Sequence, residues 1–66
     1  MKNTSFVVRD KSGEYVTGYN IAIGERVALA SARQCACSVK GDIFKKQETV
    51  EEKIYEWEDG ELKKIE

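Results

Sequence analysis

The 66-residue chain contains no histidine, no proline and only two cysteines. Without histidine, the chain lacks the usual general base for catalysis near neutral pH. Because proline interrupts helices and inner strands, its absence favours regular, hydrogen-bonded structure throughout. Two cysteines cannot form the disulfide framework of a small secreted fold, and the N-terminus lacks the apolar segment of a secretory signal. We therefore expect a protein of the reducing cytoplasm.

Long hydrophobic runs and a strong net charge are also missing. No apolar stretch approaches the roughly 18 residues of a membrane span, so we expect no membrane partner. The net charge of -1 gives the whole molecule no strong attraction to nucleic acid or to a membrane surface. Hydrophobic residues make up 41% of the chain and alternate with charged ones, as in a globular domain. We interpret residues 1–66 as one small domain with a thin core, which leaves burial against a second copy open.

The N-terminal third has the pattern of a β-hairpin. Residues 4–9 and 15–23 are rich in β-branched and aromatic types, and residues 10–14 between them have turn chemistry. Gly18, inside the second predicted strand, indicates a bulge or a close approach of another backbone.

The segment SARQCACSVKG, residues 31–41, predicts a short helix over about residues 32–40. Ser31 and Gln34 have the spacing of a capping box, and Gly41 lies where a left-handed residue often ends a helix. The preceding VALA, residues 27–30, suits either a short strand or an early helical turn. Apolar residues at helical spacing would form a small buried face: Ala32, Cys35, Ala36 and Val39.

The C-terminal segment, residues 50–66, predicts a second hairpin around Asp59-Gly60, a strong two-residue turn signal. Pairing across this turn sets Glu58 opposite Glu61, Trp57 opposite Leu62, Glu56 opposite Lys63, Tyr55 opposite Lys64 and Ile54 opposite Ile65. A helix is the alternative, because Thr49 and Glu52 also have capping-box spacing. Gly60 would cost that helix about 1 kcal/mol, which favours the hairpin.

The predicted fold class is α+β: a small antiparallel sheet from two hairpins, with the helix of about residues 32–40 packed on it, in the order ββ-α-ββ. We expect residues 42–49 to connect the helix to the second hairpin, with Ile43 and Phe44 filling the core.

The two cysteines do not predict a metal site. On a helix, Cys35 and Cys37 would lie about 200° apart. A structural zinc ion needs four ligands, which only a homodimer contributing two C-x-C pairs would supply. We interpret Cys35 as a small buried residue and Cys37 as an exposed one, and we expect no metal and no cofactor. There is also no glycine-rich phosphate loop and no evident activating partner for either thiol, so we expect no enzymatic activity.

The acidic C-terminal third is the strongest indication of function. Residues 47–66 contain eight aspartates or glutamates and three lysines, a balance that suits contact with a basic groove on another protein. We predict a non-enzymatic protein-binding module, an inhibitor or modulator of a larger cytosolic protein that is not identified by the sequence. The predicted binding residues are Glu52, Glu56, Glu58, Asp59, Tyr55 and Trp57, with the three glutamates on one face of a strand.

Two other functions stay open. Tyr15, Tyr19 and Trp57 suit stacking against single-stranded nucleic acid, although no basic stripe accompanies them, which makes nucleic acid the less favoured partner. A self-associating module would instead bury its aromatic face against a second copy. The acidic residues also have a simpler interpretation, since charges on an edge strand prevent unwanted strand pairing. In size and in its Lys/Glu-rich composition the chain resembles small phage and prophage proteins, a likeness that assigns no role to any residue.

Overall fold

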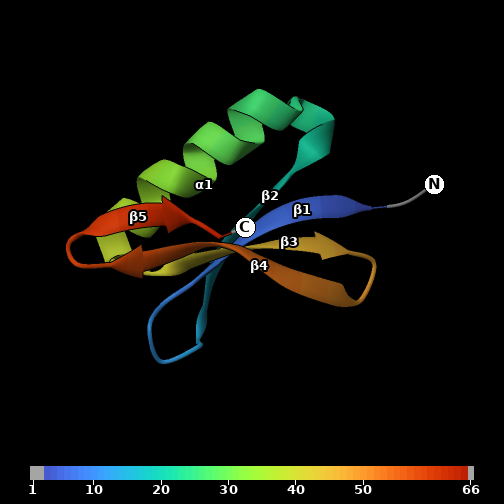
Figure 1. Ribbon diagram of the computed structural model, residues 1–66. Coiled ribbons are helices and arrows are strands. Elements are labelled where there is room, and N and C mark those ends of the chain that lie inside the picture. Colours follow the sequence, from blue (N-terminus) through green and yellow to red (C-terminus); the bar gives the residue numbers. More distant parts are fainter. Residues whose placement is uncertain (1–2, 66) are drawn as a thin grey trace.

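The computed structural model describes residues 3–65, which form a five-stranded antiparallel sheet with one helix across one face (Figure 1). The elements along the chain are β1 (Thr4–Arg9), β2 (Tyr15–Asn20), the 3-10 turn η1 (Ile21–Ile23), α1 (Glu25–Val39), β3 (Asp42–Gln47), β4 (Val50–Glu58) and β5 (Glu61–Lys64). The order across the sheet is β2-β1-β3-β4-β5, which makes β2 and β5 the edge strands. The predicted α+β class is confirmed, and the order gains a strand to become ββ-α-βββ.

The additional strand is β3, which lies at the centre of the sheet. The prediction of a connection over residues 42–49 is therefore wrong. Ile43 is fully buried, with Val8 as its register partner on β1 and Tyr55 on β4. Two features made this strand difficult to predict from the sequence. Consecutive lysines follow its apolar residues, and its turn to β4 contains no glycine. Glu48 takes the positive φ of 58° in that turn instead.

The first hairpin forms as predicted, with a turn organised by one carboxylate. Asp10 accepts hydrogen bonds from the backbone N–H groups of Ser12 (2.9 Å) and Glu14 (3.0 Å), and Gly13 supplies a positive φ of 89°. These local bonds fix the chain reversal without contributions from the core.

Strand β2 is shorter and more irregular than predicted. It ends at Asn20 rather than residue 23, because the Asn20 side chain accepts a hydrogen bond from the Ala22 N–H at 2.8 Å and begins η1. The register passes from Val8 opposite Thr17 to Arg9 opposite Tyr15. Val16 is therefore the bulged residue. The sequence predicted an irregularity at Gly18, two positions later. As a result, Tyr15 and Tyr19 lie on opposite faces of the sheet.

Helix α1 starts at Glu25, so the predicted start near residue 32 is wrong. Its N-cap is Gly24, which has no side chain to cap the helix, and the predicted Ser31–Gln34 capping box lies inside the helix instead. The VALA segment is helical because Ala28 continues the buried row of Ala32 and Ala36, spaced four residues apart. Burial of this row against the sheet outweighs the local capping signal.

The helix ends near the predicted position, but different residues have the expected roles. Lys40, rather than Gly41, adopts the left-handed conformation, with φ 57°. The N–H groups of both residues point at the Ala36 carbonyl oxygen, and the bond from Gly41 is 2.9 Å long. This pairing satisfies an otherwise free carbonyl at the end of the helix.

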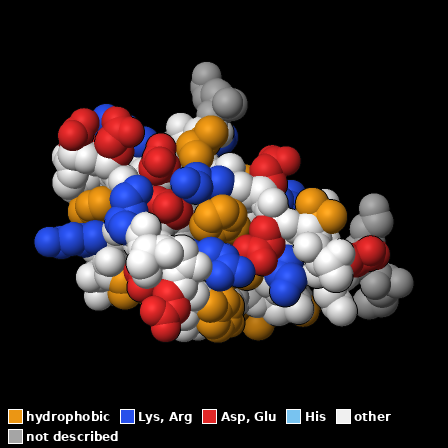
Figure 2. Space-filling view, turned by 90° about the horizontal axis from the view of Figure 1, so that it is seen from below, with side chains coloured by type: hydrophobic (Ala, Val, Ile, Leu, Met, Phe, Trp, Pro, Cys, Tyr) orange, Lys and Arg blue, Asp and Glu red, His pale blue; other side chains and the backbone are white. Residues whose placement is uncertain are grey.

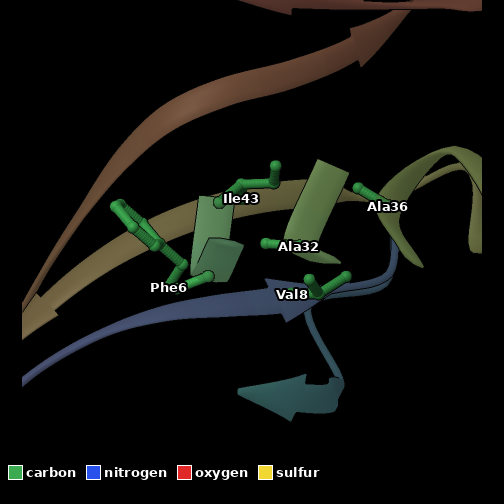
Figure 3. Close-up of a cluster of buried hydrophobic side chains, with 6 residues drawn as sticks. Phe6, Val8, Ala32, Ala36 and Ile43 are labelled. Atoms are coloured by element: carbon green, nitrogen blue, oxygen red, sulfur yellow. The ribbon is translucent and has the colours of Figure 1, made fainter. Parts of the chain in front are cut away.

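The core lies between α1 and the two central strands β1 and β3 (Figure 3). The fully buried residues of the helix are all alanines, so its backbone approaches the sheet closely, and the larger buried side chains come from the strands. Burying a valine or isoleucine side chain stabilises a fold by about 1.5–3 kcal/mol. The central cluster consists of Phe6, Val8, Ala28, Ala32, Ala36 and Ile43.

The C-terminal hairpin has the predicted register. Trp57 lies opposite Leu62, Glu56 opposite Lys63 and Glu58 opposite Glu61. The turn residues Asp59 and Gly60 both have positive φ, 53° and 76°, as a tight two-residue hairpin requires. The alternative helix over residues 50–58 is therefore wrong.

Candidate functional site

A bulge in β4 divides the acidic residues that the sequence placed together. The register with β3 passes from Phe44 opposite Lys53 to Ile43 opposite Tyr55, which leaves Ile54 as the extra residue. Ile54 and Tyr55 consequently both pack against the core. A bulge reverses the alternation of side chains along a strand, so residues before and after it exchange faces.

Glu52 therefore lies away from the other predicted glutamates. It pairs with Lys45, which pairs with Phe6 and so lies on the helix side of the sheet. Glu56 and Glu58 follow the bulge and lie on the helix-free face. The prediction that all three glutamates share a face is wrong, because a β-bulge has no dependable signal in a single sequence.

Glu56 belongs to a charge cluster around a buried carboxylate on the helix-free face. Asp42 is 6% exposed, and its Oδ1 accepts hydrogen bonds from the Trp57 N–H at 3.0 Å and from Lys11 Nζ at 3.2 Å. Lys53 Nζ lies 3.5 Å from Asp42 Oδ2 and 3.7 Å from Glu56. Glu56 thus offsets part of the positive charge of the lysines that pair with the buried Asp42 carboxylate.

The pKa of Asp42 reflects this environment. Burial by itself raises the pKa of the carboxyl group, because it disfavours the charged form. The backbone N–H of Trp57 and the ammonium groups of Lys11 and Lys53 outweigh burial and hold the pKa below its ordinary value. Asp42 is therefore a charged structural group that joins β3 to the part of β4 that follows the bulge, at Trp57.

A second ion pair crosses the same face beside an aromatic ring. Arg9 Nε and an Arg9 terminal nitrogen donate to the two carboxylate oxygens of Glu51 at 3.1 and 3.0 Å. The hydrogen bond from Arg9 lowers the pKa of Glu51. The Arg9 guanidinium and the Lys53 ammonium lie 5.9 and 5.7 Å from the centre of the Phe44 ring, within range of cation–π attraction.

These contacts make the helix-free face a charge mosaic. Figure 2 shows this face, where acidic and basic side chains alternate around separate hydrophobic ones. A surface of balanced, mutually paired charges gives little long-range attraction to a strongly charged partner. This face is therefore a poor candidate for binding nucleic acid or a basic groove.

The tip of the β4–β5 hairpin differs from this mosaic. Glu58 lies directly opposite Glu61, next to Asp59 in the turn. Lys63 Nζ is 3.7 Å from both Glu58 and Asp59, and the Asp59 side chain is 81% exposed. We call Glu58, Asp59 and Glu61 the acidic tip. Glu61 was not among the predicted binding residues, although the Asp-Gly register placed it opposite Glu58.

The predicted aromatic residues of this hairpin lie at the margin of the core. Tyr55 is half-buried, and the Arg33 guanidinium on α1 lies 5.6 Å from its ring centre. Trp57 is also half-buried and shares the helix side with its register partner, Leu62. Tyr55 therefore packs against the core and contacts α1 through Arg33.

The aromatic residues expected to stack on nucleic acid do not form one platform. Tyr15 pairs with Arg9 on the helix-free face, whereas Tyr19 pairs with Phe6 on the helix side. Trp57 lies on β4, three strands away from β2. Base stacking along one strand needs rings on a common surface, which these positions do not provide.

Cys35 is half-buried and Cys37 is exposed, close to the interpretation made from the sequence, and both are free thiols. Within residues 3–65, no group of three or more cysteine, aspartate or glutamate side chains is arranged to hold a metal ion. In the same part of the chain, no helix has the length and apolar character needed to cross a membrane. Comparisons with protein families, characterised proteins and solved structures give no significant match.

Proposed function

We propose that the protein is a non-enzymatic module that binds a larger cytosolic protein through the acidic tip of its β4–β5 hairpin. The observation that carries this proposal is the placement of Glu58 directly opposite Glu61, next to Asp59. Like charges opposite each other on neighbouring strands destabilise a hairpin by about 0.2–1 kcal/mol. The turn needs only Asp59-Gly60, so folding does not require a glutamate on each side of it.

A basic surface on a partner would relieve this repulsion. Lys63 compensates the three acidic charges only in part, and on binding, lysine or arginine side chains of the partner would add to this compensation. The charges at the tip are exposed, so their main contributions would be a faster association rate and selection against acidic partners. We therefore expect binding that weakens as ionic strength rises.

The test compares two double variants that remove the same charge. Glu58→Gln/Glu61→Gln removes the two opposed charges of the acidic tip, and Glu14→Gln/Glu52→Gln removes two exposed carboxylates elsewhere. Each protein is immobilised and the proteins that it retains from a cell extract are quantified. We expect a retained protein that binds the wild type and the control variant, and that is lost from the tip variant. Equal retention by the wild type and the tip variant would refute the acidic tip as the binding site.

A further inference from the structure

Strand β2 is an edge of the sheet whose chemistry differs from that of the other open edges. Among the described residues, unpaired strand edges occur along β2, along β5 and along residues 50–53 of β4, which β5 does not reach. The sequences of the last two, ELKK and VEEK, are charged, as is usual for edges protected against strand pairing. Strand β2, with the sequence YVTGYN, contains neither a charged residue nor a proline.

Several exposed hydrophobic side chains belong to this strand or to the segment that follows it in the chain. Seven large hydrophobic residues are exposed in the described structure, and four of them lie within residues 15–27. The other three are spread over α1, β4 and the residue after β5. The four belong to β2, η1 and the start of α1, and are Tyr15 (58%), Val16 (37%), Ile23 (57%) and Val27 (54%).

The space above β2 is open as well. A hollow of about 380 Å³ is lined by Tyr19 on β2 and by residues of α1. The α1 residues that line this hollow have small or unbranched side chains, so the hollow has room for side chains of an added strand. The helix residues are Ser31, Gln34, Cys35 and Ser38.

We propose that a second copy of this chain pairs with β2, edge to edge and antiparallel, and joins the two five-stranded sheets into one of ten strands. An uncharged strand can lie beside an identical strand without like-charge repulsion, whereas pairing at the other open edges would bring charged side chains into the contact. Two-fold symmetry about an axis through Gly18 sets Thr17 opposite the partner's Tyr19. This is a favourable pairing of a β-branched and an aromatic residue on the helix side of the sheet.

The symmetry also places both helices on the same face of the joined sheet. The hollow beside Tyr19 then becomes a trough with a helix on each side, and the exposed Val16 of each copy lies at the joined edge. In this register Asn20 lies opposite the bulged Val16, so regular pairing is limited to Thr17–Tyr19, and we expect a weak dimer that depends on concentration. The acidic tip lies at the opposite edge, on β4 and β5, so a failure of one proposal leaves the other standing.

The experiment uses the full chain and a lysine placed on the edge. Val16→Lys adds a charge of the kind that protects β5, and Val50→Lys is the matched control on β4, where Val50 is 68% exposed. Sedimentation equilibrium from micromolar to millimolar concentration measures dimerisation of the three proteins. We expect Val16→Lys to weaken the dimer at least tenfold, about 1.4 kcal/mol, and Val50→Lys to leave it unchanged.

Hydrogen exchange of the wild type locates the interface independently of any variant. We expect amides of β2 to exchange more slowly as concentration rises, with no such change in β5. A monomer at millimolar concentration would overturn the proposal, as would a dimer whose β2 amides keep their monomer exchange rates. A β2 edge occupied by a segment of another protein, on a chain that stays monomeric alone, would overturn it too. If Val16→Lys alters the fold, detected by circular dichroism, the wild-type exchange data decide.

Discussion

Gly41 packs so closely against Arg9 that a Cβ atom on residue 41 would overlap the Arg9 carbonyl oxygen. The glycine is buried and does not have a positive φ, so its role is to let the start of β3 approach β1. We expect Gly41→Ala to force the two strands apart and to lower the free energy of unfolding by about 1–3 kcal/mol or more.

Urea unfolding of Gly41→Ala measures this loss, with Gly60→Asn as its control. Gly60 has a positive φ and open space around its Cβ position, and asparagine tolerates that conformation. The control should lose less than about 1 kcal/mol. Equal losses for the two variants would mean that residue 41 has room for a side chain, contrary to the close packing described.

Gly41 also shows which features of the structure can be predicted from the sequence alone. A helix that ends near Gly41 was predicted from the rule that glycine provides left-handed caps, and the boundary is right to within one residue. The cap itself is Lys40, and Gly41 is needed for a contact with a strand 32 residues earlier in the chain. Local rules therefore predict where an element ends, whereas the reason lies in tertiary packing.

Three other sequence predictions divide in the same way: the one that rests on a local turn signal is right, and the two that depend on tertiary packing are wrong. The C-terminal hairpin register follows from Asp59-Gly60 alone, so the sequence placed Glu58 opposite Glu61 correctly. Strand β3 has no turn signal and gains its place by packing between β1 and β4, which no local pattern reports. The bulge at Ile54 then moves Glu52 to the other face, so the candidate site was predicted only around the turn.

Asp42 makes the fold sensitive to acid. Its pKa is lower in the folded chain than the ordinary value of 3.8, so the carboxylate stabilises the fold above that value. This stabilisation is lost as the pH falls through the lower, folded-state pKa. Asp42→Asn should therefore lower the free energy of unfolding by about 1–3 kcal/mol at pH 7. The gap from the wild type should shrink below about pH 4.

Denaturant unfolding at a series of pH values tests this prediction. The control is Asp59→Asn, which removes the same charge from an 81% exposed side chain and should change stability by no more than about 0.5 kcal/mol. A gap between wild type and Asp42→Asn that stays constant down to the lowest pH would show that the Asp42 charge does not stabilise the fold.

The alanine row of α1 limits how large a residue the helix can present to the sheet. Ala32 is fully buried between the helix and the strands, so leucine at this position must push the helix outward. We expect Ala32→Leu to lower the free energy of unfolding by about 1–3 kcal/mol. Ala30→Leu, on the exposed side of the same helix, should stay within about 0.5 kcal/mol of the wild type. Thermal unfolding of both variants gives the comparison, and similar melting temperatures would show that the interface tolerates a larger side chain.

The planar guanidinium group of Arg9 links β1 to β4, so we expect that lysine cannot replace arginine at this position. A lysine keeps the charge but cannot donate to both oxygens of Glu51 in a fixed geometry. Arg9→Lys should therefore lower the melting temperature more than Arg26→Lys, which makes the same change on an exposed part of α1. In the Glu51→Gln background, the extra effect of Arg9→Lys should largely disappear, as a double-mutant cycle would report. Additive effects in that cycle would mean that the two side chains act separately.

Removing the Glu61 charge from the acidic tip should stabilise the isolated protein while it weakens binding. Glu61→Gln removes the repulsion with Glu58 and keeps the shape of the side chain, so the free energy of unfolding should rise by about 0.2–1 kcal/mol at low salt. Salt screens exposed charges, so the gain should fade as ionic strength increases. Urea unfolding at low and high salt measures both effects, with Glu14→Gln as the control for general loss of negative charge. A destabilised Glu61→Gln protein would show that Glu61 supports the fold, and would remove the argument that the opposed glutamates are kept for a partner.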